Sequence, residues 1–290
     1  MHPFLDLGFI QVPTYGIFLS TAILVGWMLF LRLAKRDGID GDKAGAAAFW
    51  ALVAGVVGGK VGLILVDLPI YLSQPQEIFT VGFLRAAGVV WTAVLAGAAA
   101  FAWTARRGKL PMGRLVDAAA LPVPICQAIG RIGCLMAGCC YGGRCDLPWG
   151  IVYDSQEAHL RTGVPLGVGL HPAPMYEALW SLAVVLPLLV LVRRRRRAPG
   201  EVVLAYFGLY ALGRFVVEFF RGDDLRGVWF GGAVSTSQLI SLAVFPLALA
   251  AWIYLRRRAP RAATATATAP AAAPAAPKSA KPPKSGKRNG

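Results

Sequence analysis

The chain has 290 residues, of which 56% are hydrophobic and only 16% charged, a composition too apolar for an ordinary soluble domain. Long uncharged stretches recur along it, so the sequence predicts an all-α polytopic membrane protein. The formal net charge of +15 does not indicate a nucleic-acid partner, because nine of the 30 Lys and Arg residues lie from Arg256 onward.

Seven segments are expected to cross the membrane, since about twenty apolar residues span a hydrocarbon core of about 30 Å. Residues 1–13, which precede them, form a short amphipathic segment expected at the membrane interface. This segment lacks the basic region and the cleavage site of a secretory signal, so the first span is expected to direct insertion. The seven predicted spans are 15–34, 46–71, 88–104, 115–137, 172–192, 202–220 and 237–255.

The distribution of basic residues predicts the orientation, because Lys and Arg concentrate in cytoplasmic loops. The segments after the first, third, fifth and seventh spans hold four, four, five and nine of them, 22 of the 30, when Arg32 at the end of the first span is counted with the segment that follows it. We therefore expect the amino terminus outside and the carboxyl terminus inside. Residues 259–290, rich in Ala, Pro and Lys, are expected to form a disordered basic cytoplasmic tail after a membrane domain of residues 1–258.

A few ionisable residues lie within the predicted spans, and such residues indicate a functional site by default. Arg214 and Glu218 are spaced i, i+4 on the sixth span, so they share a face and can neutralise each other. A purely structural ion pair is the alternative interpretation. Lys60 and Arg131 have no carboxylate within one helical turn, because the acids of their predicted spans, Asp67 and Asp117, lie seven and fourteen residues away. Arg221 follows Glu218 by one turn. This surplus of positive charge favours a phosphate-bearing ligand, which arginine binds bidentately.

Residues 130–144 read G-R-I-G-C-L-M-A-G-C-C-Y-G-G-R. Four cysteines, Cys134, Cys139, Cys140 and Cys145, follow a C-x4-C-C-x4-C spacing that matches none of the usual structural zinc patterns, so no metal and no cofactor are expected. A disulfide or a thiol relay on the outer face is an alternative, which makes a membrane thiol oxidoreductase the second functional hypothesis. Small packing residues are the simplest interpretation of the cluster.

His171 precedes the fifth predicted span in the segment H-P-A-P-M-Y-E. A histidine at the membrane face can act as a general base, and a role at the start of the helix is an equally good interpretation. Glu177 falls in the first turn of that span, where a carboxylate suits the helix dipole.

In combination these features resemble the prolipoprotein diacylglyceryl transferase family, from Tyr15 to Gln238. The sequence departs from the family pattern at Thr92, which stands at or near a family histidine, and at Cys134 and Cys139, which replace an asparagine and an acidic residue of the signature. The pieces that carry the resemblance are Gly58-Gly59-Lys60-Val61-Gly62, Gly130-Arg131-Ile132-Gly133, Gly142, His171-Pro172, Tyr176-Glu177, Tyr210, Arg214-Phe215 and residues 217–221.

The resemblance implies a multi-pass enzyme of the bacterial inner membrane. Such an enzyme transfers the diacylglyceryl group of phosphatidylglycerol to the lipobox cysteine of a prolipoprotein signal peptide, the first step of lipoprotein maturation. It implies that Arg131 binds the lipid phosphate and that Arg214, held by Glu218, stabilises the leaving group. His171 is the candidate catalytic base of a chain that has Thr92 in place of the family histidine. A catalytically weak lipid-binding paralogue is a third hypothesis. The other substrate-binding residues that the resemblance implies are Tyr15, Lys60, Gly142 and Tyr210.

Overall fold

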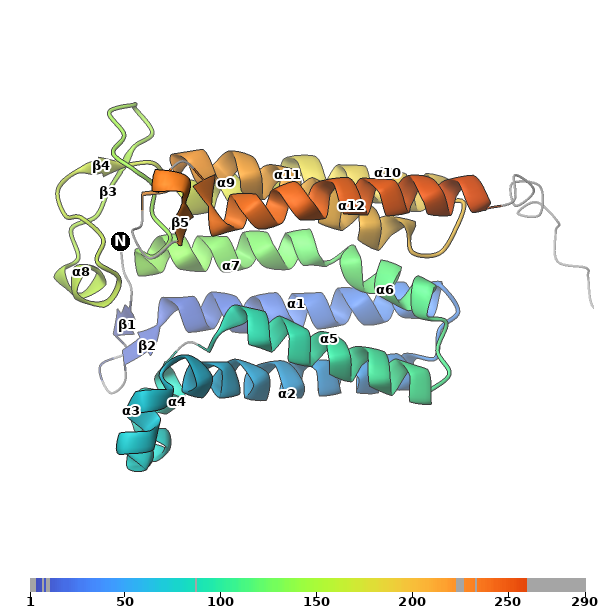
Figure 1. Cartoon of the computed structure of the whole chain (residues 1–290), viewed down its shortest axis with the longest axis horizontal. Helices are drawn as coiled ribbons and strands as arrows, with labels where there is room; N and C mark the ends of the chain where they lie inside the picture. Colours follow the sequence, from blue (N-terminus) through green and yellow to red (C-terminus); the bar gives the residue numbers. More distant parts are fainter. Residues whose placement is uncertain are drawn as a thin grey trace, which may run out of the picture. The chain divides into compact units, whose positions relative to one another are not determined.

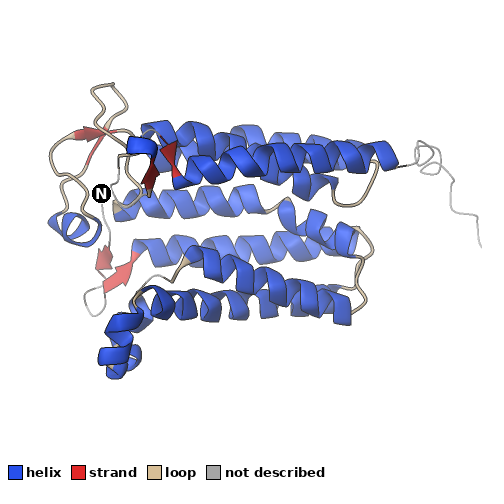
Figure 2. Ribbon diagram, in the orientation of Figure 1, coloured by secondary structure: helices blue, strands red, loops and turns tan. Residues whose placement is uncertain are grey.

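The computed structural model describes residues 4–6, 8, 11–86, 88–222, 227–232 and 234–259. Figure 2 shows that helices make up most of this part of the chain, with strands only in short pairs. From residue 260 onward the predicted tail lies outside the described residues. The expected boundary between membrane domain and tail therefore stays a prediction.

Long helices lie side by side in the described part of the chain (Figure 1). Two of them are assembled from shorter pieces: α6 continues into α7, and α9 passes through a π-helical turn, η2, into α10. The helices are α1 (Thr14–Arg36), α2 (Gly41–Val66), α5 (Val90–Arg107), α6 (Met112–Ala120), α7 (Val123–Ala137), α9 (Ala173–Leu179), η2 (Trp180–Val185), α10 (Leu186–Arg195), α11 (Glu201–Val217) and α12 (Thr236–Arg258).

Short elements gather at the end of the helices where α1 begins and α7 finishes (Figure 1). Antiparallel pairing joins β1 with β2, β3 with β4, and β5 with β6. These elements are β1 (Phe4–Asp6), β2 (Gln11–Pro13), α3 (Leu68–Ser73), η1 (Pro75–Phe79), α4 (Val81–Arg85), β3 (Ile151–Val152), α8 (Gln156–Thr162), β4 (Gly169–Leu170), η3 (Glu218–Phe220), β5 (Val228–Trp229), η4 (Phe230–Gly232) and β6 (Val234–Ser235).

Six helical segments of the described residues are long and apolar enough to cross a membrane. The third predicted span, residues 88–104, does form a helix, α5, but this helix has only 18 residues and ends in Arg106 and Arg107. A count of seven spans, and the orientation, are therefore still predictions. The six segments are Thr14–Arg36, Gly41–Val66, Met112–Ala137, Ala173–Arg195, Glu201–Phe220 and Thr236–Arg258.

The limits of the second predicted span, residues 46–71, are wrong, because the helix α2 covers residues 41–66. The helix α2 begins at Gly41, where the side chain of Asp40 caps it by accepting from the backbone N–H groups of Asp42 and Lys43. It ends at Val66 with Asp67 as the C-cap, and Pro69 lies in the first turn of the next helix, α3. Proline suits a first turn because its missing N–H is not needed there.

At the end of the helices opposite the short elements, buried carboxylates connect neighbouring helices through hydrogen bonds and ion pairs. Asp117 on α6 is fully buried and accepts hydrogen bonds of 2.9 to 3.1 Å from three backbone N–H groups at the start of α11. Arg196 contacts the same carboxylate at 3.2 Å, and Arg193 contacts Asp37 at 2.8 Å. A carboxylate at a helix N-terminus satisfies its unpaired N–H groups and its dipole. These contacts fix the ends of α1, α6, α10 and α11 against one another.

Candidate functional site

Three arginines and two glutamates meet near the end of α7 and form what we call the arginine network. Arg131 comes from α7, Glu177 from α9 and Arg214 from α11, three helices that pack together. Glu218 and Arg221 belong to the turn that follows α11. All five side chains are at most 22% exposed. The network is therefore a set of charges held largely out of water.

Glu177 is the centre of the arginine network. Its Oε2 atom lies 2.7 Å from a guanidinium nitrogen of Arg131, and its Oε1 atom lies 3.7 Å from Arg214 and 3.6 Å from Arg221. The sequence predicts Glu177 in the first turn of its helix, where it would interact with the helix dipole. This prediction is wrong, because α9 begins at Ala173 and no acidic residue lies in its first turn. The signal that could have found this role was Arg131, a buried cation that needs a carboxylate partner from some other span.

The predicted pairing of Arg214 with Glu218 is present in the structure, with 2.6 Å between the nitrogen and oxygen atoms. Arg214 also donates a hydrogen bond of 3.0 Å to the hydroxyl of Ser237 at the start of α12. Arg214 is thus held by carboxylates of two elements and by a hydroxyl of a third. The role of Ser237 had no signal in the sequence, because α12 reaches α11 only through packing.

Arg131 uses one terminal nitrogen of its guanidinium for the contact with Glu177. A guanidinium has five N–H donors in a fixed fork, so this contact leaves donors that can receive an anion. A largely buried arginine at this depth of an apolar helix favours such a ligand.

Two tyrosines predicted to bind substrate lie close to the arginine network. Tyr210 stacks on Tyr206, with ring centroids 5.8 Å apart, and interacts electrostatically with Glu177. Tyr15 is at the start of α1, which packs tightly on α7: a Cβ atom added at Gly133 would lie 3.3 Å from the Tyr15 ring. Tyr15 is 39% exposed, so one face of its ring can contact a ligand or lipid.

His171 sits beside the arginine network in an aromatic setting. Its Nδ1 atom lies 3.0 Å from the hydroxyl of Tyr176, which also accepts a 3.0 Å hydrogen bond from the indole N–H of Trp149. The imidazole ring lies 5.4 Å from the ring of Phe220, between centroids. Phe220 directly precedes Arg221, so His171 is adjacent to the network through the turn after α11.

Gly142 packs between His171 and the turn after α11. Its N–H donates to the carbonyl of His171 at 2.9 Å, and the N–H of Gly143 donates to the carbonyl of Phe220 at 2.9 Å. A Cβ atom at Gly142 would collide with His171 and lie 2.6 Å from the Phe220 carbonyl oxygen. Only glycine permits this approach. Gly142 therefore acts on the site through its backbone.

Lys60 has partners of a different kind from those of the arginines. Its ammonium group donates to the carbonyl oxygens of Phe83, Ala86 and Leu84, at 2.5, 2.7 and 3.2 Å, and lies 4.9 Å from the centre of the Phe83 ring. A lysine has three N–H donors, and three carbonyls are enough to engage them all. These contacts hold the end of α4 and the residue after it against α2, and a role in substrate binding stays a prediction.

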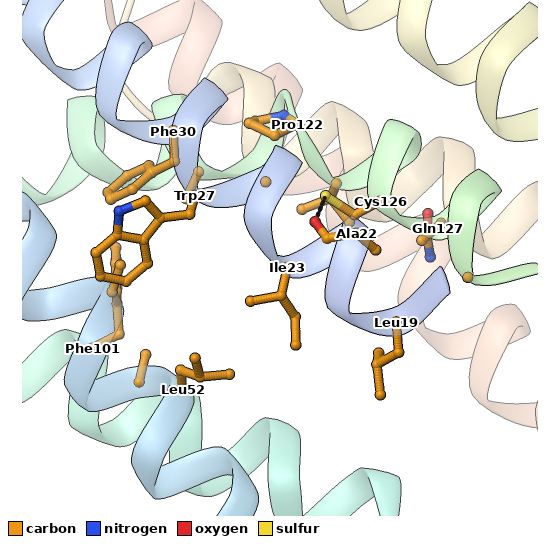
Figure 3. Close-up of a pocket in the computed structure, with 16 residues that line it drawn as sticks. Leu19, Ala22, Ile23, Trp27, Phe30, Leu52, Phe101, Pro122, Cys126 and Gln127 are labelled. Atoms are coloured by element: carbon orange, nitrogen blue, oxygen red, sulfur yellow. Dashed lines mark hydrogen bonds between the residues drawn. The ribbon is translucent and has the colours of Figure 1, made fainter. Parts of the chain in front are cut away.

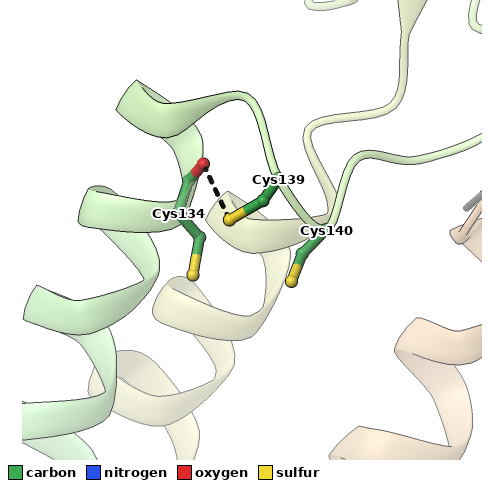
Figure 4. A group of neighbouring side chains, drawn as sticks. All are labelled: Cys134, Cys139 and Cys140. Carbon is green, nitrogen blue, oxygen red and sulfur yellow. Dashed lines mark hydrogen bonds between the residues drawn. The ribbon is translucent and has the colours of Figure 1, made fainter. Parts of the chain in front are cut away.

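Three of the five cysteines form a cluster that we call the thiol trio: Cys134, Cys139 and Cys140. Their sulfur atoms all lie within 4.8 Å of one another, and Figure 4 shows them gathered around the end of α7 and the loop that follows. Cys145 is buried elsewhere in that loop. The linear spacing of four cysteines thus becomes a three-sulfur cluster in space.

An apolar cavity of about 480 Å³ lies among α1, α2, α5 and the α6–α7 segment. Figure 3 shows Ile23 of α1 and Leu52 of α2 turned toward the space between their helices. The lining reaches Gln127 and Gly130 on α7, and Gly130 directly precedes Arg131. The cavity therefore leads toward the arginine network.

Comparison with known proteins identifies relatives along nearly the whole chain. A sequence model of the prolipoprotein diacylglyceryl transferase family matches residues 3–254. A phosphatidylglycerol–prolipoprotein diacylglyceryl transferase of Geobacter sulfurreducens is 31% identical over 260 residues, which cover 88% of this chain and 95% of that protein. Its counterpart in Campylobacter lari is 30% identical over 258 residues, 85% of this chain and 90% of the relative. In Clostridium perfringens, the transferase numbered 2 is 29% identical and covers 81% and 88% respectively.

Proposed function

Because the chain belongs to the prolipoprotein diacylglyceryl transferase family, we propose that it transfers the diacylglyceryl group of phosphatidylglycerol to the cysteine thiol of a prolipoprotein. The observation that supports this function on the chain itself is the arginine network, in which three largely buried guanidinium groups gather around two glutamates. Guanidinium groups bind phosphate oxygens through parallel N–H donors, and phosphatidylglycerol carries one phosphate.

Arg131 is the proposed ligand of the lipid phosphate. One of its terminal nitrogens contacts Glu177 at 2.7 Å, and this contact fixes the plane of the guanidinium. A guanidinium has five N–H donors in a fixed fork, so one carboxylate contact leaves donors for a phosphate oxygen. Glu177 would thus position Arg131, and Arg131 would hold the phosphate.

Arg214 is proposed to stabilise the leaving group. In the reaction, a C–S bond forms at the glyceryl carbon that carries the phosphate ester, and the C–O bond at the same carbon breaks. The electron pair of the C–O bond passes to the phosphate oxygen, so glycerol phosphate leaves with one more negative charge. A preorganised cation near that oxygen lowers the barrier because the charge develops only in the transition state. Glu218 and Ser237 hold Arg214 in place.

The apolar cavity is proposed to receive an acyl chain of the lipid. Its lining is made of apolar side chains from α1, α2, α5 and α7, which suit hydrocarbon. Since it reaches Gly130, a lipid with its tail in the cavity would carry its phosphate toward Arg131. Tyr15 and Tyr210 would then flank the head group from α1 and α11.

His171 is proposed to take the proton of the acceptor thiol. In the neutral tautomer whose Nδ1–H donates to the hydroxyl oxygen of Tyr176, Nε2 carries no proton and is the nitrogen that would accept one. Tyr176 would then orient the imidazole ring and favour this tautomer.

The direct test is transfer by the full chain in vesicles that contain phosphatidylglycerol. A lipobox peptide should gain the mass of a diacylglyceryl group, and the same peptide with serine in place of cysteine should not. Glu177→Gln should abolish transfer, whereas Glu157→Gln, which removes an exposed pair with Arg161, should leave it unchanged. A folded protein that gives no thioether product and fails to complement a strain depleted of its own transferase would contradict the proposed function.

A further inference from the structure

The thiol trio has no part in the chemistry described so far, yet it lies beside the arginine network. We propose that Cys134, Cys139 and Cys140 bind one zinc ion and that its fourth coordination position accepts the lipobox cysteine. This inference rests on the proposed function, because it assigns the zinc ion to the activation of the acceptor thiol.

The backbone after α7 is shaped so that the three sulfurs converge. The helix ends at Gly138 in a left-handed conformation, and the N–H of Cys139 returns to the carbonyl of Cys134 at 3.1 Å. Cys140 has a φ of 59°, in the left-handed region that residues other than glycine seldom adopt. Such conformations persist where the surrounding structure imposes them, and they cluster at functional sites. At Cys140 the conformation brings the third sulfur to the other two.

The separation of the sulfurs is close to what zinc requires. Tetrahedral zinc with Zn–S bonds of about 2.3 Å places its sulfur ligands about 3.8 Å apart. In the structure the three Sγ atoms lie within 4.8 Å of one another, so closure by about 1 Å or less, within reach of small side-chain rotations, would complete the geometry. Structural zinc sites are closed by four protein ligands, whereas catalytic sites keep one position for water or substrate. Three cysteines therefore correspond to a catalytic site.

The chemistry of the three donor atoms also favours zinc at this place. Zinc is borderline-soft and accepts thiolates readily, unlike the harder magnesium and calcium ions.

The proposed step can be written with its bonds balanced. The acceptor thiol coordinates zinc and loses its proton to His171 or to water, since a metal-bound thiol is deprotonated outright. The zinc-bound sulfur then supplies the electron pair of the new C–S bond to the glyceryl carbon. The electron pair of the broken C–O bond leaves with glycerol phosphate. The thioether product is neutral and binds zinc weakly, so the product dissociates. No electron is gained or lost by the metal.

The first experiment measures metal content. The full chain, purified in detergent without chelator, should contain about one zinc ion per chain by elemental analysis. Cys134→Ser, Cys139→Ser and Cys140→Ser should each lose it, whereas Cys145→Ser, a buried cysteine outside the trio, should keep it. Zinc in Cys140→Ser at the wild-type level, or a disulfide within the trio of the isolated wild-type chain, would overturn the proposal.

The second experiment uses wild-type protein, so that it does not depend on the folding of a variant. The zinc ion is replaced by cobalt(II), whose thiolate charge-transfer absorption reports on bound sulfur. That absorption should increase when the lipobox peptide is added and stay constant with the serine peptide. Constant absorption with both peptides would contradict the open position.

Transfer assays separate this proposal from the proposed function. Removal of zinc by a strong chelator should abolish transfer, and zinc, but not magnesium, should restore it. Full transfer by zinc-free protein would contradict the zinc proposal and leave the transferase function intact. Bound zinc together with no transfer under any condition would contradict the transferase function and leave the zinc site in place.

Discussion

Arg131 has one carboxylate partner and a proposed phosphate ligand, and this combination determines what its substitution should do. Arg131→Lys keeps the charge and can keep the contact with Glu177, but it loses the planar fork that binds a phosphate through two parallel bonds. We expect the initial transfer rate to fall at least about tenfold with little change in thermal stability. The rate is measured on a lipobox peptide in phosphatidylglycerol vesicles. Near-normal turnover would remove the phosphate role from Arg131.

Arg214 and Glu218 test whether a buried ion pair is structural or catalytic. Glu218→Gln leaves the guanidinium with the longer contact to Glu177 and the hydrogen bond to Ser237. Breaking a buried ion pair typically costs about 3–5 kcal/mol. That variant should therefore lose both stability and transfer. Arg214→Gln should lower transfer more than it lowers the yield of folded protein, because only the arginine faces the leaving group.

The double variant decides between the two interpretations of this pair. If Arg214→Gln combined with Glu218→Gln recovers stability without transfer, the arginine is catalytic. Recovery of transfer in the double variant would mean that the pair only holds the helices together. The single and double variants are compared by apparent melting temperature and by initial rate.

Sequence spacing could predict the pair of Arg214 with Glu218 because both residues lie on one helical face, four residues apart. It could not predict that Arg131, Glu177 and Arg221 share the same site, because their contacts arise only from packing among α7, α9 and α11. The thiol trio shows the same limit. A spacing rule written for four-ligand structural zinc sites gave no match, whereas the left-handed turn at Cys140 assembles three sulfurs.

At the scale of elements, the loop after α7 is positioned by a glycine with no room for a side chain. Gly142→Ala would push a methyl group into His171 and the Phe220 carbonyl, and so separate the loop from the turn that carries Arg221. Transfer should fall by about a hundredfold, since small misplacements of catalytic groups can cost that much. Gly143→Ala is the matched control, because nothing lies within 4 Å of a Cβ atom there. Equal rates for the two variants would contradict this account.

At the end of the helices opposite the short elements, Asp117 joins α6 to the start of α11. Asp117→Ala removes the acceptor of three backbone N–H groups at the start of α11 and the partner of Arg196. Because those groups would stay buried without a partner, we expect a loss of about 3–5 kcal/mol in stability. The specific activity of the protein that stays folded should be close to normal. Asp146→Ala, in which the lost carboxylate is 86% exposed, should leave the melting temperature unchanged.

The limits of most helices could be predicted from apolar runs, since α1 and α12 differ from their predicted spans by only a few residues. Breaks inside the runs could not be predicted from hydropathy. The fourth predicted span, 115–137, is divided by Pro122 into α6 and α7, and the carboxylate of Asp117 lies on the first piece. Asp117, an acid within an apolar run, was a signal that another part of the chain supplies hydrogen-bond donors there, because a buried carboxylate requires them.

At the scale of the whole molecule, the number of crossings determines which side of the membrane each terminus faces. An even number of spans places both termini on one side, and an odd number places them on opposite sides. The six segments that satisfy length and apolarity would therefore disagree with the orientation predicted from the basic residues. The difference depends on α5. This helix packs against α2 over much of its length, with Gly58 close to Ala96 and Gly97 close to Ala51, so the two helices run antiparallel.

We therefore predict that α5 crosses the membrane and that the chain has seven spans. A rise of 1.5 Å per residue makes an 18-residue helix about 27 Å long, close to the thickness of the hydrocarbon core, and Arg106 and Arg107 would reach the cytoplasmic head groups. A phosphatase reporter, active only outside the cytoplasm, should be active when inserted after Gln74, which precedes α5, and inactive after Lys109, which follows it. A fluorescent protein that folds only in the cytoplasm should give the reverse pattern. Equal phosphatase activity at the two positions would mean that α5 does not cross; activity after Lys109 alone would invert the orientation and place the arginine network on the cytoplasmic side, where an exported prolipoprotein could not reach it.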